Sequence, residues 1–231
     1  MKPSKPVAEA ARLAALNAYR LLDTPSDQSY DDLTGLAAYI CQTPMALMVL
    51  LDAQRQWFKS RVGIAALETP RERGFCAHAV LSDSTLIIED AAADERFAGN
   101  PLVTGEPHIR FYAGALLMSP EGHALGTLCV IDRQPRQLKS EQLAALEGLA
   151  RQIVAQMELR RVADELSAAL QGMRELRSLL PICAWCKNIR NDAGYWGRVE
   201  EYLHEQTGAD LTHGICPDCA VKMSAMIDPS A

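Results

Sequence analysis

The stretch MALMVLL at residues 45–51 decides the fold of the N-terminal part of the chain. Near-continuous apolar character over the length of one strand predicts a buried central strand. We expect a turn at residues 52–56, a second strand at 57–62 and a third at 85–89. The segments 109–119 and 124–132 predict a hairpin around Pro120-Glu121-Gly122.

Two amphipathic segments precede the central strand. Residues 8–22 and 30–41 carry apolar side chains three or four positions apart, which predicts a helix in each. Helices beside several antiparallel strands indicate an α+β domain in which one face of the sheet is covered.

The composition excludes several classes of protein. The chain has 231 residues, a length that suits one full domain plus a smaller module. Its net charge is −6. No run of Lys and Arg offers a stripe for phosphates, so we expect no nucleic-acid partner. The first twelve residues do not resemble a secretory signal, and the run at 45–51 is too short to cross a bilayer. We therefore expect a cytoplasmic protein with no membrane partner.

Residues 140–180 predict one long helix. The stretch contains no Pro and only Gly148 and Gly172, Ser140 is a plausible N-cap, and Pro181 ends it. About 40 helical residues would extend roughly 60 Å, more than the width of a small domain. We interpret the helix as a connector between a domain at 1–139 and a cysteine module at 181–231. The alternative is two helices with a break near Gly172.

Two apolar stripes in different heptad registers run along this helix. The second stripe is displaced by two residues, or roughly 200° of rotation, near residues 158–161. We expect the first stripe to cover the sheet and the second to form a parallel coiled coil with another copy, giving a homodimer. The alternative is a helix packed wholly within its own chain. The first stripe is Leu143, Leu146, Ala150, Ile153 and Met157, and the second is Leu159, Val162, Leu166, Ala169, Met173, Leu176 and Leu180.

Four of the seven cysteines form two C-x-x-C pairs, Cys183 with Cys186 and Cys216 with Cys219. Two such turns supply the four thiolates of a tetrahedral metal site, and thiolate ligands select zinc or iron. We predict structural zinc in a module too small to fold on an apolar core alone. A thiol redox switch, an iron–sulfur cluster and haem ligation are the alternatives. His213, three residues before Cys216, could replace one cysteine as a ligand, and the simpler interpretation is a hydrogen-bond donor to the site or a surface residue.

Several segments of the N-terminal part together resemble a GAF domain of the kind found in bacterial sensor kinases and cyclic di-GMP enzymes. They are residues 16–33, QWFK at 56–59, FCAH at 75–78, NPLV at 100–103, IRFYAG at 109–114 and GTLCVID at 126–132. The resemblance covers residues 8–160. It implies a six-stranded antiparallel sheet, helices on one face, a small-molecule pocket on the other under the loops of residues 63–108, and signalling through the flanking helices.

The resemblance does not identify the ligand. The cyclic-nucleotide signature of GAF domains is not found, and the surroundings of Cys76 differ from those of bilin-binding members. The candidate pocket residues are Trp57, Cys76, His78, His108, Arg110 and Tyr112. For residues 75–78 the alternative is a short helix that packs Phe75 and Cys76 into the core. For Arg110 it is a salt bridge with Asp90 or Asp94.

The C-terminal segments around the cysteine pairs resemble an extension that follows sensory or receiver domains in bacterial signalling proteins. No segment of the chain resembles a kinase, a cyclase, a helix-turn-helix or a Walker loop. We therefore expect a non-catalytic sensor or adaptor with an unknown downstream partner. A second hypothesis makes the four cysteines the input of a redox or metal sensor. A third is a free methionine sulfoxide reductase, which would need a low-pKa thiol and a resolving partner among Cys41, Cys76 and Cys129. Cys129 lies in an apolar strand, where core packing is the simpler interpretation.

Overall fold

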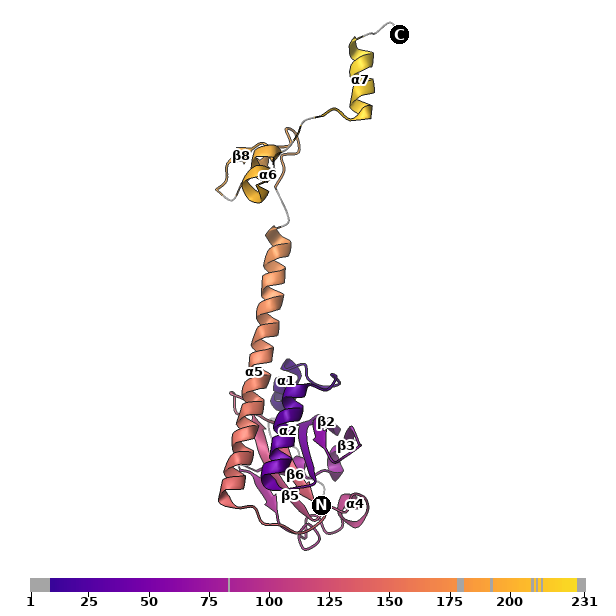
Figure 1. Cartoon of the computed structure of the whole chain (residues 1–231), viewed down its shortest axis with the longest axis vertical. Coiled ribbons are helices and arrows are strands. Elements are labelled where there is room, and N and C mark those ends of the chain that lie inside the picture. Colours follow the sequence, from indigo (N-terminus) through magenta and orange to yellow (C-terminus); the bar gives the residue numbers. More distant parts are fainter. Residues whose placement is uncertain are drawn as a thin grey trace. The chain divides into compact units, whose positions relative to one another are not determined.

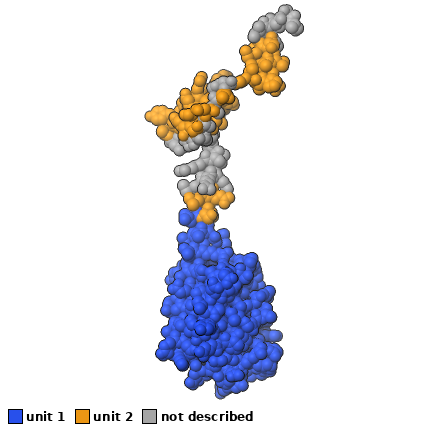
Figure 2. All heavy atoms as spheres, viewed as in Figure 1, with its two compact units in different colours: residues 1–166 blue, residues 167–231 orange. Residues whose placement is uncertain are grey.

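The chain forms two compact units, residues 1–166 and 167–231 (Figure 2). The computed structural model describes residues 9–82, 84–177, 181–191, 193–208, 210, 212 and 214–227. Predictions that involve Leu180 and His213, and the side chains of Met173 and Leu176, lie outside the described residues.

An antiparallel six-stranded sheet forms the centre of the first unit (Figure 1). Its order is β3-β2-β1-β6-β5-β4, with β1 and β6 in the middle. All seven residues of β1 are buried, as the apolar run predicts. β3 was not predicted, because three residues that end in Pro70 carry no alternating pattern. The strands are β1 Met45–Leu51, β2 Arg55–Val62, β3 Glu68–Pro70, β4 Leu86–Ile88, β5 Phe111–Met118 and β6 Ala124–Asp132.

Alternation along β1 divides the core into two layers. Ala46, Met48 and Leu50 lie in the layer that contacts the long helices. Leu47 and Val49 point to the opposite layer, under the loops between β2 and β5. The sheet therefore has one face for helices and one face for a site.

Three helices cover the first of these faces (Figure 1). They are α1 Glu9–Ala18, α2 Gln28–Cys41 and the N-terminal half of α5 Ser140–Arg177. Asp27 caps α2 by accepting a hydrogen bond from the backbone N–H of Ser29. On α5, the side chains of Leu146, Ala150, Ile153 and Met157 are at most 2% exposed. The prediction that the first stripe covers the sheet is therefore confirmed for these four residues, whereas Leu143 is half-buried and lies outside this core cluster.

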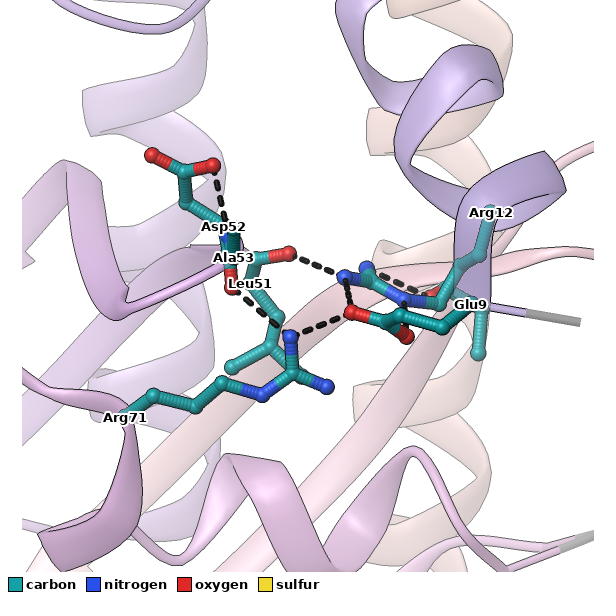
Figure 3. Close-up of polar contacts among 7 residues, drawn as sticks. Glu9, Arg12, Leu51, Asp52, Ala53 and Arg71 are labelled. Atoms are coloured by element: carbon teal, nitrogen blue, oxygen red, sulfur yellow. Dashed lines mark hydrogen bonds and ion pairs between the residues drawn. The ribbon is translucent and has the colours of Figure 1, made fainter. Parts of the chain in front are cut away.

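A buried cluster of charges fastens α1 to one end of the sheet (Figure 3). Glu9 accepts hydrogen bonds from Arg12 and from Arg71, which belongs to the short 3-10 helix Arg71–Arg73. Arg12 also donates to the carbonyl of Leu51 over 2.7 Å, and Arg71 donates to that of Asp52 over 2.9 Å. Each buried guanidinium is thus paired with a carboxylate and with backbone oxygen, as charges inside a protein require.

The helix α5 runs without a break from Ser140 to Arg177, so the alternative of two helices separated at Gly172 is wrong. Its second stripe is exposed: Leu159 by 71%, Val162 by 50% and Leu166 by 59%. The described part of the chain places no second helix along this stripe, so a coiled coil is not shown. Self-association through these side chains stays a prediction.

The second unit contains short elements. They are β7 Ile189–Arg190, β8 Trp196–Gly197, α6 Val199–Thr207 and α7 Pro217–Ile227. Trp196 lies in β8 and pairs with Arg190, and Arg198 caps a helix that begins at Val199. Among the described residues of the whole chain, no helix is long and apolar enough to cross a membrane.

Candidate functional site

A cavity of about 190 Å³ lies between the sheet and the loops on the face opposite the long helices. β1 and β2 supply its apolar floor, and α4 Pro101–Thr104 with the segment 105–109 supplies part of its roof. Apolar side chains dominate, with a few polar groups among them, as is usual for small-molecule sites. The lining residues are Leu47, Val49, Gln56, Phe58, Ile64, Ala66, Thr69, Gly74, Phe75, Cys76, Leu102, Glu106, Pro107, Ile109, Tyr112, Cys129 and Ile131.

A cluster of four side chains, which we call the thiol cluster, borders this cavity. It consists of Cys76 on α3 Cys76–Ala79, Tyr112 on β5, and Thr127 and Cys129 on β6. The hydroxyl of Thr127 donates to Cys76 Sγ over 3.1 Å, and that of Tyr112 donates over 3.4 Å. The Cys129 thiol is a third hydrogen-bond partner of Cys76. All four residues are at most 4% exposed.

The pKa values of the two thiols are shifted in opposite directions. Burial raises the pKa of Cys76, but hydrogen bonds from Cys129, Thr127 and Tyr112 outweigh burial and lower it below its ordinary value. Burial, together with the hydrogen bond to Cys76, raises the pKa of the Cys129 thiol. Cys76 is therefore the thiol of the pair that ionises first.

Glycine at position 114 allows Tyr112 to reach the cluster. A Cβ atom at residue 114 would lie 2.2 Å from the Tyr112 hydroxyl oxygen, so any larger side chain would displace the phenol. Gly114 pairs with Cys129 across β5 and β6, which brings the phenol beside that thiol. The ring of Tyr112 also stacks on Phe75 at 5.1 Å, and Phe75 stacks on Phe97 at 4.4 Å.

Of the predicted pocket residues, Cys76 and Tyr112 line the cavity. Trp57 alternates with Gln56 and Phe58 on β2, so it packs in the core layer on the helix side. His78 borders a separate polar pocket of about 260 Å³ with Arg73, Arg96 and Asn100. The side chain of His108 is 56% exposed, 3.8 Å from Glu106.

Arg110 forms a salt bridge with Asp90, which is the alternative to ligand binding that the sequence left open. Its Nε and Nη2 atoms each donate to a carboxylate oxygen of Asp90 over 2.6 Å. The salt bridge holds the pKa of Asp90 below its ordinary value. The expected short helix at 75–78 is also present as α3, with Phe75 and Cys76 in the core.

Thr127 and Cys129 are not among the predicted pocket residues. Cys129 is fully buried, as its position in an apolar strand predicts. One signal was available: residues 127, 129 and 131 alternate along β6, so they share the face that Tyr112 occupies on β5.

In the second unit, each cysteine pair adopts a turn that suits a thiolate. Backbone N–H groups of Cys186, Trp185 and Lys187 hydrogen-bond to Cys183 and lower the pKa of its thiol. Lys187 has a φ of 63°, and its N–H donates to the Cys183 carbonyl over 3.0 Å. N–H groups of Cys219 and Asp218, at the N-terminal end of α7, likewise lower the pKa of Cys216.

The two cysteine pairs are not brought together as a metal centre. Within the described ranges, no group of three or more His, Cys, Asp or Glu side chains is placed to hold a metal ion. The local turns fit thiolate ligation, whereas the four-ligand site that the sequence predicts is not assembled.

Residues 6–157 match the family model of the GAF domain. The chain belongs to the GAF domain family. The six-stranded antiparallel sheet, with helices on one face and a cavity on the other, is the arrangement that the resemblance implied. The C-terminal extension with its cysteine pairs lies outside the matched residues.

A cyclic di-GMP phosphodiesterase of Pseudomonas aeruginosa is similar to part of this chain. It is 44% identical over 156 residues, which are 67% of this chain and 27% of the relative. The chain therefore spans little more than a quarter of that relative's length, and the activity in the relative's name belongs to that whole protein.

Solved GAF structures share the fold at low sequence identity. The GAF domain of an Acinetobacter phosphoenolpyruvate-protein phosphotransferase has a TM-score of 0.51 and 19% identity, covering 68% of this chain and 96% of that one. A free methionine-R-sulfoxide reductase of Neisseria meningitidis, solved with its substrate, has a TM-score of 0.50 and 17% identity, covering 70% and 98%. At these identities the likeness shows the fold alone.

Proposed function

We propose that this GAF protein is a non-catalytic sensor or adaptor of bacterial signal transduction, in which the cavity of the first unit takes up a small ligand. The observation that carries the proposal is the cavity of about 190 Å³, which backs onto the same sheet whose other face is covered by α5. A ligand that shifts β1 or β6 therefore acts on the packing of α5. The proposed ligand is compact and largely apolar, because Leu47, Val49 and Phe58 form the floor.

We further propose that α5 relays the signal as a homodimer. The exposed side chains of Leu159, Val162, Leu166 and Ala169 follow the three-and-four spacing of a two-stranded coiled coil. A second copy of the same helix would bury this stripe with its own. The downstream partner would then contact the second unit.

We propose that Cys183, Cys186, Cys216 and Cys219 are the ligands of a zinc ion. The N–H groups that surround Cys183 and Cys216 favour their thiolate forms, and deprotonated thiols are the ligands that zinc takes. When bound, the metal would supply a structural cross-link between the two turns. A redox role for the same four cysteines is the competing proposal, since zinc thiolates are oxidisable.

The cavity proposal is tested by thermal unfolding of the full chain with indole as a small apolar probe. Ligand that binds the folded state raises the melting temperature. Leu102→Trp fills the roof of the cavity and should abolish the rise, whereas Leu81→Trp at an exposed position should retain it. An equal rise in both variants would place binding elsewhere.

Native mass spectrometry of the purified chain tests the remaining proposals together. We expect a dimer that carries one zinc ion per chain. Zinc that stays bound through mild peroxide treatment would argue against the redox role of the four cysteines. Turnover of free methionine sulfoxide would overturn the non-catalytic assignment.

A further inference from the structure

We propose that Cys76 and Cys129 form a redox-active thiol pair, which a small peroxide admitted to the cavity oxidises to a disulfide. The inference deepens the proposed sensor role, on which its biological meaning rests, by naming a covalent input for the same cavity. Its chemistry is independent of reversible ligand binding and of the four C-terminal cysteines.

The geometry around Cys76 carries the proposal. Two donors from neighbouring strands converge on one sulfur atom: the hydroxyls of Thr127 and Tyr112. The Cys129 thiol lies beside the same sulfur atom and interacts with it. A buried cysteine that serves only as packing needs no such donors, because a thiol behaves as a small apolar group. Donors directed at sulfur favour a thiolate, the form that attacks an oxidant.

The cavity provides access. Cys76 and Cys129 both line it, although neither side chain is more than 4% exposed to bulk solvent. A volume of about 190 Å³ admits a molecule the size of hydrogen peroxide beside both sulfur atoms. Glutathione and large alkylating reagents would be excluded by the same dimensions.

The two thiols are suited to different steps. Hydrogen bonding lowers the pKa of Cys76 despite its burial, whereas burial raises the pKa of Cys129 well above its ordinary value. Cys76 is therefore the attacking thiol and Cys129 the resolving thiol. An environment that pushes the pKa values of two neighbouring groups apart is a recurrent sign of divided roles.

The oxidation proceeds in two steps, through a sulfenic acid to a disulfide. The Cys76 thiolate attacks one oxygen of hydrogen peroxide, the O–O bond breaks, and hydroxide leaves and takes up a proton to become water. The product is a sulfenic acid on Cys76. Cys129 then attacks the Cys76 sulfur, the S–O bond breaks, and a second water leaves with the Cys129 proton. Two electrons pass from the thiol pair to the peroxide, and an added dithiol reverses the change.

The disulfide would link elements that matter for signalling. It would join α3, in the loop region over the cavity, to β6 in the middle of the sheet. Leu128 and Val130 on β6 flank Cys129 and belong to the core cluster that contains the buried stripe of α5. A strain placed on β6 by oxidation therefore reaches α5 through direct packing.

Peptide mapping of the full chain tests the proposal. The reduced protein is treated with hydrogen peroxide, unfolded in the presence of an alkylating reagent, and digested. We expect a cross-linked peptide that contains Cys76 and Cys129, formed at least ~10-fold faster than Cys41 is oxidised. Cys41 is the internal control: it is 2% exposed, and burial raises its pKa to about 11.

Two conservative variants separate an organised site from chance proximity. Thr127→Val and Tyr112→Phe each remove one donor while keeping the volume of the side chain, and each should slow the cross-link by about 3- to 10-fold. Tyr30→Phe is the matched control, because it removes a buried hydroxyl that has no hydrogen-bond partner in the described structure. It should leave the rate unchanged.

Several results would overturn the inference. They are oxidation of Cys76 no faster than that of Cys41, an oxidised Cys76 with Cys129 still alkylated, and rates insensitive to both donor variants. The indole experiment above reports on ligand uptake without peroxide. Failure of the redox inference and failure of the ligand proposal can therefore be told apart.

Discussion

Tyr19 donates a hydrogen bond from its hydroxyl to the carboxylate of Glu158 on α5. Burial, together with the neighbouring Glu158 carboxylate, raises the pKa of Tyr19 well above its ordinary value. Glu158 also accepts a hydrogen bond from Arg161 over 2.9 Å, and Arg160 reaches Asp27 over 3.1 Å. The change of heptad register near residues 158–161 thus coincides with polar contacts from α5 to Tyr19, which follows α1, and to Asp27, the N-cap of α2.

Removing this hydroxyl should loosen the attachment. Tyr19→Phe deletes a hydrogen bond to a charged group, so we expect a loss of about 1–2 kcal/mol in the free energy of unfolding. Denaturant unfolding of the full chain measures it. Tyr39→Phe is the control, because Tyr39 is 81% exposed on α2 and its variant should change stability by less than about 0.5 kcal/mol. Equal effects in the two variants would contradict an anchoring role for Tyr19.

The buried pairing of Glu9 predicts a defined pH dependence of stability. Burial raises the pKa of Glu9, but hydrogen bonds and charges from Arg12 and Arg71 outweigh burial and bring it to about 2. Because the folded pKa lies below the unfolded value, the stabilisation is complete above about pH 4.5 and is lost as the pH falls towards 2.

Glu9→Gln leaves two buried guanidinium groups without their carboxylate. We expect about 3 kcal/mol of destabilisation at pH 7. The difference from the unmodified chain should shrink between pH 4.5 and 2 in denaturant titrations. Glu95→Gln is the control, because Glu95 is exposed and its variant should change stability at pH 7 by less than about 0.5 kcal/mol. A difference independent of pH would mean that Glu9 acts by packing instead of by charge.

The exposed stripe of α5 predicts a dimer that one substitution can break. Leu166→Lys places a charge in the proposed seam and should give a monomer in analytical ultracentrifugation at micromolar concentration. Ala163→Lys, also exposed on α5 but outside the stripe, should leave the dimer intact. A monomeric unmodified chain would contradict the coiled-coil proposal.

Metal content should depend on the cysteine pairs and on no other thiol. We expect Cys183→Ser and Cys219→Ser to lose zinc in metal analysis and to lose helical signal at 222 nm from the second unit. Cys129→Ser should retain the metal. Unchanged zinc in Cys219→Ser would exclude the second pair as ligands.

The sequence by itself determined the plan of the first unit. The apolar run of β1 predicted a buried strand, and the turn Pro120-Glu121-Gly122 between two apolar segments predicted the pairing of β5 with β6. The three-and-four spacing on α5 placed Leu146 and Ile153 against the sheet. These are local patterns, and the hydrophobic effect acts on each of them wherever it occurs.

The tertiary structure alone decided which polar side chains meet. Cys76 and Thr127 are 51 positions apart, and their contact depends on a loop that returns over the sheet. The salt bridge of Arg110 with Asp90 was one of two possibilities that the sequence left open, and the fold decided between them. Trp57 lies on the helix face because it pairs with Leu50 of β1, which belongs to that layer. Periodicity assigns a residue to a face, but a hydrogen bond requires donor and acceptor within about 3 Å, and only the folded chain sets that distance.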